Sequence, residues 1–363
     1  MQKIISILIM CFGISMLYAQ ETPAWCAKKT RIHAKKKVDS TILAQRLKTL
    51  NVTATRPYLI KLFVVIFSSD DGSAATVSHE DVKRQIANMR DYFAPHDICF
   101  ALAAIQNVNN SALYSINVID EEVLLTPYIR DGYITIFVHN SVFNPGQPGI
   151  AGSAYDIPNN YLSVEGPVLA DSDKILLAHE MGHCFGLLHT FEDFEGEENV
   201  ARSGGCKDCE DDGDYLCDTP ADRIVASSFI DDNCNYTGSR RDDCGSILIM
   251  ATDNLMSYHR VSCITRFTGG QGKRCRDHIV SESILTDALA GDNFNIFFPS
   301  VVTSDYKIYV ARNTVTFDAN GWVSTGSAKV SASANAIVVK AGTQFQPTAN
   351  AGYAVLRVNP FCQ

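Results

Sequence analysis

The sequence predicts a mixed α/β domain followed by a small all-β module. Hydrophobic residues make up 46% and charged residues 20% of the 363 residues, which are ordinary values for a chain with a buried core. Strand-like and helix-like segments alternate over the middle of the chain. From about Ser304 onward only short strand-like runs follow, among Gly, Asn, Ser and Thr residues. We therefore expect more than one folded unit.

The elements of the α/β domain can be placed by their patterns. The segment 58–67 is rich in β-branched and aromatic residues, which predicts a buried strand. Ser78 and Asp81 form the start signal of a helix with apolar residues at helical spacing up to Phe93. Further elements are expected as strands at 98–105, 133–138 and 161–164, a helix from 171–173 to about 185, and a last helix capped by Thr268 and Gln271 that reaches 289.

The N-terminus has the pattern of a secretory signal peptide. Lys3 precedes an apolar run from Ile4 to Leu17, and the stretch closes at Ala19. The run is shorter than the roughly 20 residues that span a bilayer, which disfavours the alternative of a membrane anchor. We expect residues 1–19 to be removed and the protein to be secreted, either freely or with retention at the cell surface. The twelve cysteines agree with an oxidising, extracellular environment.

Charge is distributed unevenly along the chain. The net charge is −9, which argues against a nucleic-acid-binding surface. Residues 20–56 nevertheless carry nine basic and two acidic side chains, so the body that follows is strongly acidic. We interpret residues 20–57 as a basic pro-segment that inhibits this body, with a solvated basic linker as the alternative. No nucleic-acid partner and no membrane span are expected.

One stretch, from His179 to His189, carries the chemistry. His179 and His183 are four residues apart, so on a helix they share one face and lie about 6 Å apart along its axis. Glu180 lies next to them, where it could take a proton from metal-bound water. Gly186 allows the helix to end with a positive φ, so that His189 can fold back as a third ligand. Three imidazoles that leave a fourth position open are typical of a catalytic Zn²⁺ site.

This eleven-residue pattern resembles the signature of the metzincin metalloproteases, which is followed by a turn that contains methionine. The segment Asn254-Leu255-Met256-Ser257-Tyr258 is similar to that turn. Further motifs resemble the pappalysin family of metzincins, close to its bacterial members: His189-Thr190-Phe191, residues 213–220, Cys263 seven residues after the methionine, and Phe267-Thr268-Gly269-Gly270-Gln271. The resemblance covers about residues 58–289 and does not include the tail.

The resemblance implies a twisted, mostly parallel sheet with the active-site helix, and an irregular, disulfide-rich lower subdomain. The catalytic domain would comprise residues 58–300 and the β-rich module residues 301–363. It also implies a secreted zinc endopeptidase, made as a latent zymogen, that cleaves proteins or peptides by zinc-activated water. Glu180 would act as general base and acid, Met256 as a hydrophobic floor, and Tyr258 would stabilise the oxyanion. The alternative from another class is an exported binding or adhesion protein with a structural zinc site.

An acidic, cysteine-rich insert follows the third histidine. Residues 191–222 hold twelve acidic and two basic side chains, which is typical of either a solvated loop or a Ca²⁺ site. The sequence from Asp214 to Pro220 resembles the calcium-binding loop of the bacterial pappalysins. That resemblance implies Asp214, Leu216 and Thr219 as calcium ligands.

Six cysteines surround this insert. In an exported chain, structural disulfides are favoured over a redox or zinc pair at Cys206 and Cys209. The family pattern implies a bridge Cys234–Cys263 and a bridge from Cys206 or Cys209 to Cys244. Cys217 is an addition to that pattern and is expected to pair with whichever of Cys206 and Cys209 is left over. Four further cysteines stay unassigned: Cys99, Cys184, Cys275 and Cys362.

Cys26 lies in the basic pro-segment. Removing it from the eleven cysteines of the mature chain leaves an even number for pairing. A thiolate is a strong zinc ligand and could fill the position that water needs, as a pro-segment cysteine does in pappalysin relatives. We therefore expect Cys26 to bind zinc in the latent form until cleavage near residues 46–56 releases it. The alternative is a disulfide, for instance with Cys362.

The stretch from Ser257 to Ser262 bears on specificity. It contains Arg260 and no acidic residue. Bacterial pappalysins that prefer arginine after the scissile bond carry acidic residues in this stretch. An arginine side chain would lack a charge partner here and meet repulsion, so we expect no strong preference for arginine.

Overall fold

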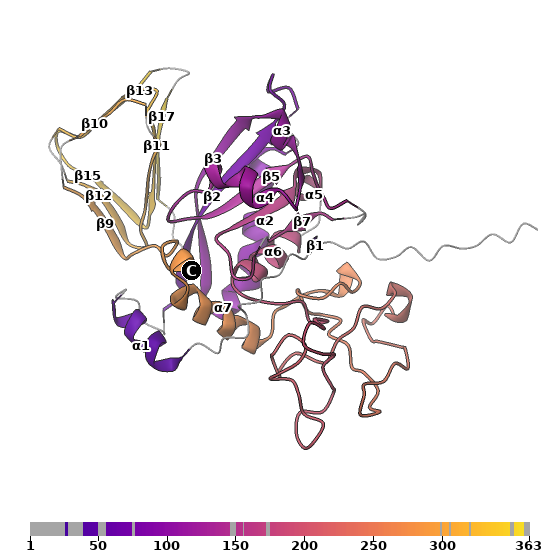
Figure 1. The fold of residues 1–363 in the computed structure, drawn as a ribbon. Coiled ribbons are helices and arrows are strands. Elements are labelled where there is room, and N and C mark those ends of the chain that lie inside the picture. Colours follow the sequence, from indigo (N-terminus) through magenta and orange to yellow (C-terminus); the bar gives the residue numbers. More distant parts are fainter. Residues whose placement is uncertain are drawn as a thin grey trace, which may run out of the picture.

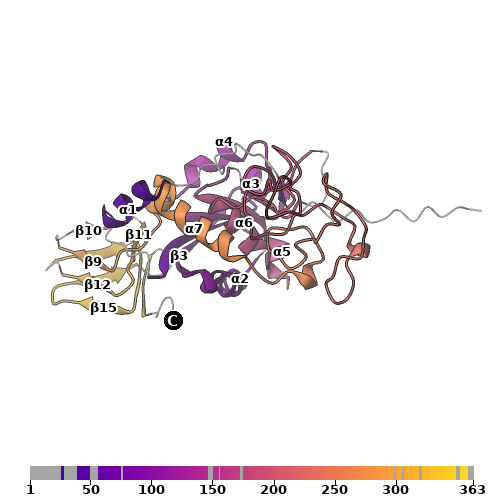
Figure 2. The same ribbon diagram turned by 90° about the horizontal axis from the view of Figure 1, so that it is seen from below.

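The computed structural model describes residues 26–27, 39–49, 56–74, 77–145, 150–154, 156–171, 175–297, 300–304, 306–318, 321–348 and 352–358. The predicted signal peptide, residues 1–19, and most of the predicted pro-segment lie outside these residues. Figures 1 and 2 show an α/β domain with a triangular β module on one side and a long irregular segment on the other.

A six-stranded sheet forms the centre of the α/β domain, in the order β1-β7-β8-β5-β2-β3. Neighbouring strands are parallel except β7 with β8, so the predicted mostly parallel sheet is confirmed. The apolar run 58–67 forms β2, which is buried because apolar clusters cover both of its faces. The strands are β1 (Cys26–Ala27), β7 (Gly152–Ser153), β8 (Tyr161–Glu165), β5 (Ile134–His139), β2 (Tyr58–Ser68) and β3 (Ile98–Asn109).

Two long helices begin where their capping signals predict. Helix α2 (His79–Phe93) has a complete capping box between Ser78 and Asp81, and α7 (Gly269–Ser281) has one with Thr268 as its N-cap. Helix α7 does not reach residue 289 as expected. Its backbone becomes extended at residue 282, and the separate short helix α8 (Ser283–Thr286) follows.

Helix α6 (Leu176–Cys184) carries the first two histidines of the motif and is buried along its whole length. The predicted start at 171–173 is wrong, because Asp171 has extended backbone with ψ of −177° after the separate helix α5 (Gly166–Ala170). Helices α2, α6 and α7 pack on one face of the sheet around a shared apolar core (Figure 1).

Smaller elements complete the α/β domain. The opposite face of the sheet is covered by a second apolar cluster that includes Leu113, Ile116 and Leu125. The predicted pro-segment contributes α1 (Ser40–Thr49), which lies beside α7 in Figure 1. The remaining elements are α3 (Ser111–Tyr114), α4 (Glu121–Leu125), the parallel pair β4 (Ser115–Asn117) and β6 (Ser141–Phe143), and the 3-10 turns η1 (Ala94–His96) and η2 (Thr126–Tyr128).

Residues 186–268, all of them described, form an irregular subdomain whose helical turns are η3 (Ser227–Phe229) and η4 (Val261–Cys263). Three disulfides hold it together: Cys206–Cys244, Cys209–Cys217 and Cys234–Cys263. The bridge Cys234–Cys263 is confirmed, and the open choice is settled, because Cys206 takes Cys244 and leaves Cys209 for Cys217. These cysteines therefore form neither a redox nor a zinc pair.

The cysteines left unassigned by the sequence have different states. Cys99 is disulfide-bonded. Cys184, on the histidine helix, and Cys275 are buried free thiols. Cys362 lies outside the described residues.

The C-terminal module is a parallel β-helix of three coils, a more specific architecture than the small all-β module that the sequence predicts. Each coil gives one strand to each of three parallel sheets, which form the sides of the triangle in Figure 1. The first coil begins with β9 at residue 293, eight residues before the predicted start of the module. The sheets are β9 (Asn293–Ile296) with β12 (Thr314–Phe317) and β15 (Ala336–Val339), β10 (Val301–Val302) with β13 (Val323–Gly326) and β16 (Gln344–Pro347), and β11 (Tyr306–Val310) with β14 (Lys329–Ala334) and β17 (Tyr353–Val358).

The β-helix packs against β3, one edge strand of the central sheet. Ser331 Oγ donates a hydrogen bond to the Ala103 carbonyl over 2.8 Å, and the Tyr306 ring packs edge-on against Phe63. This edge of the sheet is therefore covered, and the other edge is formed by β7 with β1, which lies in the predicted pro-segment. Among the described residues, no helix has both the length and the apolar character needed to cross a membrane.

Candidate metal centre and active site

Helix α6 and the turn after it assemble three histidines. His179 and His183 lie one helical turn apart on α6. Gly186 then adopts a φ of 89°, and Leu187 N donates to the Gly182 carbonyl, so the chain turns back toward the helix. A methyl group added at Gly186 would lie 2.6 Å from the ring of His278, so the turn has room only for glycine.

The three imidazoles, including His189, face a common point. Their Nε2 atoms lie 3.2 Å apart for His179 and His183, 3.3 Å for His179 and His189, and 3.1 Å for His183 and His189. Nδ1 of His179 donates to the Leu255 carbonyl over 2.7 Å, and Nδ1 of His183 donates to the Leu187 carbonyl over 2.8 Å. Because a carbonyl only accepts, each of these rings has its proton on Nδ1 and turns the lone pair of Nε2 inward.

This arrangement fits a metal ion with nitrogen ligands. Lone pairs at about 3 Å from one another repel unless a cation lies among them. Burial lowers the pKa of His179 to about 4, so its imidazole is neutral at pH 7 and able to bind a metal. In the described part of the chain, His179, His183 and His189 are the group of side chains placed to hold such an ion.

Glu180 lies on α6 next to the first histidine and is fully buried. Strand β7 passes directly over it. A methyl group added at Gly152 would lie 2.5 Å from Glu180 Oε1, so Gly152 leaves the space that the carboxylate occupies. The structure thus places Glu180 between the histidine helix and the edge of the central sheet.

The methionine turn lies on the other side of the cluster. Met256 is fully buried and packs against the middle of α6, where a methyl group at Gly182 would lie 2.7 Å from its Sδ atom. The ring of Tyr258 lies with its centroid 4.7 Å from that of His189 and 5.8 Å from that of His179. The structure therefore brings Tyr258 beside the histidines, and its chemical role stays a prediction.

A buried hydrogen-bond network, which sequence analysis missed, joins the two sides of the site. The Asp222 carboxylate accepts from His259 Nε2 over 2.6 Å and from the Thr190 hydroxyl. Thr190 follows His189 and His259 follows Tyr258, and all three members of the network are buried. Asp222 therefore ties the loop of the third histidine to the loop of the tyrosine. Residues so far apart in sequence form no local pattern that could reveal this link.

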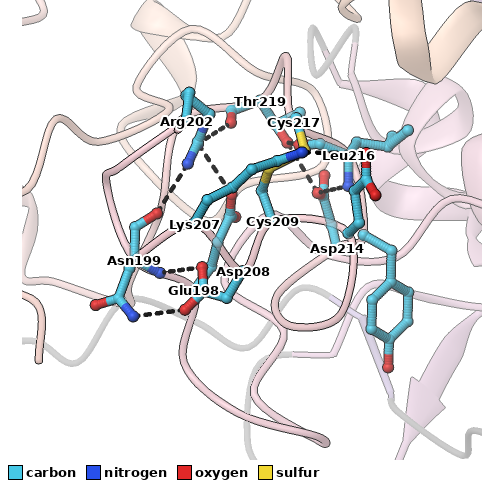
Figure 3. The surroundings of a disulfide bond; sticks show 12 residues. Glu198, Asn199, Arg202, Lys207, Asp208, Cys209, Asp214, Leu216, Cys217 and Thr219 are labelled. Atoms are coloured by element: carbon cyan, nitrogen blue, oxygen red, sulfur yellow. Dashed lines mark hydrogen bonds and ion pairs between the residues drawn. A yellow bond between two sulfur atoms is a disulfide. The ribbon is translucent and has the colours of Figure 1, made fainter. Parts of the chain in front are cut away.

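The expected calcium loop is closed by the disulfide Cys209–Cys217 (Figure 3). Asp214 is buried, and its Oδ1 accepts from Leu216 N over 3.0 Å and from Thr219 Oγ1 over 2.8 Å. Its Oδ2 has no hydrogen-bond partner among the described residues. Burial raises the pKa of Asp214 to about 7. A buried carboxylate with one unbonded oxygen is a fit for an oxygen-binding cation.

Glu198 is a second buried carboxylate at this loop that sequence analysis did not single out. It lies against Gly213, where an added methyl group would come within 2.7 Å of Glu198 Oε2. Burial, and then the charge of Asp214, raise the pKa of Glu198 to about 9. Arg202 Nη2 lies 2.9 Å from Glu198 Oε1 and also donates to the Thr219 carbonyl (Figure 3). The Leu216 carbonyl likewise accepts from Thr219 Oγ1 over 2.6 Å, so both carbonyls expected to bind calcium already accept a hydrogen bond.

Strand β1 places the backbone of the predicted pro-segment beside β7, at the site. Cys26 pairs with Gly152, and Ala27 with Ser153, in parallel register. The Cys26 side chain lies outside the described part of the structure, so its binding to zinc stays a prediction. Farther along the pro-segment, Leu43 of α1 packs against the main core.

The segment that carries the site matches a known family. The family model described as pregnancy-associated plasma protein-A (Peptidase_M43) matches residues 147–280, which run from β7 through α6 and the methionine turn into α7. This segment of the chain is similar to the pappalysin family. Extracellular metalloproteases of Arthroderma gypseum and Colletotrichum graminicola are each 28% identical to the chain, over 218 and 250 residues. These alignments cover 56% and 63% of this chain, and 67% and 79% of the relatives.

Solved structures of mirolysin in complex with compound 9 and of Tannerella forsythia promirolysin are also similar to this chain. Their identities are 19% and 16%, their TM-scores 0.47 and 0.48, and they cover 64% and 72% of this chain at 96% and 95% of their own lengths. The family match and the histidine cluster together make this protein a zinc metalloendopeptidase that acts on peptide substrates.

Proposed function

We propose that the three histidines hold the zinc ion and that Glu180 is the general base and then the general acid of peptide hydrolysis. The observation that carries this proposal is the position of Glu180, buried beside the histidine cluster and beneath the edge strand β7. When bound, a zinc ion with imidazole ligands supplies Lewis acidity, which polarises a carbonyl and makes a water more acidic. Glu180 takes the proton of the attacking water and returns it to the leaving amine, while the Tyr258 hydroxyl donates to the developing oxyanion.

The test is casein cleavage by the activated, zinc-loaded enzyme and by Glu180→Gln. Glutamine keeps the shape of the side chain and cannot accept the proton. We expect the variant to keep zinc and to lose at least about 10²-fold in kcat. Equal activity of the two proteins would remove Glu180 from the mechanism.

We further propose that the substrate lies as an antiparallel strand on β7. The other edge of the sheet is covered by the β-helix, whereas β7 runs directly over Glu180. Backbone hydrogen bonds to an edge strand hold a peptide independently of its sequence. The pro-segment strand β1 takes this same edge in parallel orientation, opposite to such a substrate.

The position of β1 on this edge of the sheet offers an explanation for the inactivity of the precursor. We propose that residues 20–57 inhibit the enzyme by occupying β7 and that Cys26 binds the zinc ion in the latent form. The pairing of Cys26 with Gly152, above Glu180, supports this. Helix α1 anchors the same segment on α7. Cleavage near residues 46–56, at the end of α1 or in the segment after it, would separate the pro-segment from the catalytic domain. The Cys26 thiolate could then leave the zinc ion.

Two further proposals concern location and a second metal. We propose that residues 1–19 direct export and that the enzyme acts outside the cell, which the names of the fungal relatives support. We also propose a structural Ca²⁺ at the Asp214 loop, with Asp214, Leu216 and Thr219 as ligands and Glu198 as an added carboxylate. The unbonded Asp214 oxygen and the buried Glu198 support it.

A further inference from the structure

A cavity lies where the β-helix meets the edge strand β3 of the central sheet. Its volume is about 200 Å³, and its walls come from segments far apart in the sequence: β3, the start of α2, and the β-helix strands β14 and β17. Figure 1 shows β17 on the side of the triangle that faces β3. Strand β3 is four strands away from β7, so roughly 19 Å separates this edge from the edge over Glu180. The cavity is therefore separate from the histidine cluster.

A β-bulge in the edge strand forms the floor of the cavity. Ala103 has no counterpart on β2, so it is an extra residue that bends β3. Its carbonyl accepts the hydrogen bond from Ser331 of the β-helix over 2.8 Å, which satisfies this acceptor. The other lining residues of β3 are Leu102, Ala104 and Ile105. Their aliphatic side chains offer no hydrogen bond and favour contact with the apolar part of a ligand.

Basic side chains line the remaining walls. On β17, the alternate residues Tyr353, Val355 and Arg357 share one face and line the cavity together. On α2, the lining residues His79 and Lys83 lie one helical turn apart. None of the residues that line the cavity in the described chain is acidic, although the whole chain has a net charge of −9. The cavity therefore attracts an anion locally, against the overall charge of the protein.

Arg357 is the basic group that is most available to a ligand. Its side chain is partly buried, and its guanidinium has no hydrogen-bond or ion-pair partner among the described residues. Lys83 pairs with Glu80 over 2.5 Å, but Glu80 is 81% exposed, so a ligand can replace this pair at little cost. His79 Nε2 is hydrogen-bonded to Asn107 over 3.1 Å, which fixes the ring at the rim. An unpaired guanidinium in a concave site is suited to bind a carboxylate with two parallel hydrogen bonds.

We propose that this cavity binds a carboxylate on a short apolar stem. Arg357 and Lys83 hold the carboxylate, and the aliphatic floor holds the stem. The occupant is small, because sites for drug-sized ligands span about 300–1,000 Å³ and this cavity lies below that range. A free short-chain carboxylic acid and a glutamate side chain of a polypeptide share this chemistry. A sulfate ion would leave the floor unoccupied.

Binding at this position joins two parts of the molecule. Arg357 belongs to the β-helix and Lys83 to the α/β domain, so a ligand held by both bridges the junction. Such a ligand binds the folded protein and raises its Tm by mass action. The inference does not depend on proteolysis, and its test needs no measurement of activity.

The test measures binding to the full chain by calorimetry, with pentanoate as the probe and Tm as a second readout. Pentanamide is the neutral match, sulfate reports general ionic attraction, and N-acetylglutamate methylamide represents a glutamate of a polypeptide. Pentanoate should bind at least about tenfold more tightly than pentanamide or sulfate. Arg357→Gln should weaken pentanoate about 10–100-fold, since it removes a charged hydrogen-bond donor. Val355→Phe should abolish binding, because the larger ring fills the cavity.

Lys340→Gln is the matched control. Lys340 lies on the same β-helix, pairs with Asp318 over 2.6 Å and does not line the cavity, so its substitution should leave the pentanoate affinity unchanged. If Val355→Phe fails to fold, Arg357→Gln still decides, because the Arg357 side chain has no partner in the described structure to lose.

The remaining outcomes either name the source of the carboxylate or overturn the proposal. Blocked glutamate that binds as tightly as pentanoate supports a polypeptide ligand, whereas binding of pentanoate alone supports a free acid. Pentanamide or sulfate that binds as tightly as pentanoate overturns the proposal, as does an unchanged affinity in Arg357→Gln. The absence of binding at about 10 mM pentanoate has the same consequence.

Discussion

Gly152 lies so close to Glu180 that a methyl group on its α-carbon would come within 2.5 Å of Glu180 Oε1. Strand β7, which we propose binds the substrate, therefore lies directly against Glu180, the proposed general base, at Gly152. The same glycine pairs with Cys26 of the predicted pro-segment. If the proposed function holds, inhibition, substrate binding and proton transfer all depend on a glycine at this position of β7.

Gly152→Ala is expected to lower kcat for casein about 10²-fold or more, because the added methyl must displace the Glu180 carboxylate, and about 1 Å of misplacement costs that much. Zinc content should stay at one ion per molecule. Gly205→Ala is the control, since an added methyl there meets nothing within 4 Å. Wild-type kcat in Gly152→Ala would show that Glu180 is not held by this contact.

Asp222→Asn is expected to lower the free energy of unfolding by about 1–3 kcal/mol, because the amide nitrogen replaces one of the two buried oxygens that accept from His259 and Thr190. It should also lower kcat, since the loop of Tyr258 loses its link to the loop of His189. Urea unfolding measures the first effect. Asp232→Asn, at an exposed pair with Arg260, should change stability by less than about 0.5 kcal/mol.

A double-mutant cycle tests how Asp222 acts on the rate. If Asp222 works by positioning Tyr258, its substitution should reduce kcat much less in the Tyr258→Phe background than in wild type. Full additivity of the two effects would show that Asp222 and Tyr258 act independently.

Removal of the metal should abolish proteolysis. His183→Ala is expected to lose zinc and activity together, because two imidazoles hold the ion too weakly for catalysis. Phenanthroline should inactivate the wild type, and added zinc should restore it. His79→Ala, at an exposed residue outside the cluster, should keep both metal and activity. A fully active metal-free preparation would refute the zinc assignment.

Calcium should stabilise the protein more as the pH rises. Burial raises the pKa of Asp214 to about 7 and of Glu198 to about 9, above their ordinary values of 3.8 and 4.5. At pH values between the ordinary and the raised pKa of each carboxyl group, the folded state binds more protons than the unfolded state. The stability of the calcium-free protein therefore falls as the pH rises. Calcium binds the ionised carboxylates and offsets this loss.

The measurement is Tm from pH 5 to 9 with and without millimolar calcium. The difference between the two curves should widen with pH and should shrink in Asp214→Asn. Two curves that coincide at every pH would mean that the loop holds no calcium.

Cys26→Ala should give a precursor that is active early or cleaves itself during expression, because the thiolate no longer blocks the zinc ion. Activity on casein and the size of the purified precursor report this. A variant that stays as latent as wild type, or a disulfide mapped at Cys26, would rule out zinc binding by this residue.

The sequence by itself determined the features that depend on local spacing. The capping boxes at Ser78 and Thr268 predicted the starts of α2 and α7, because a cap involves residues three positions apart. The His179–His189 pattern predicted three histidines at one point, because helix periodicity and a glycine turn position them. The family resemblance extended this local information to the fold and the enzyme class.

Only the tertiary structure decided which distant segments meet. The choice of Cys206 as the partner of Cys244, the link from Asp222 to His259, and the stacking of β9 under β12 all join residues many positions apart. The surface position of Arg260, whose guanidinium pairs with Asp232, was equally hidden. Local spacing sets the backbone of one element, whereas contacts between elements depend on how their side chains pack, and no periodicity in the chain records that packing.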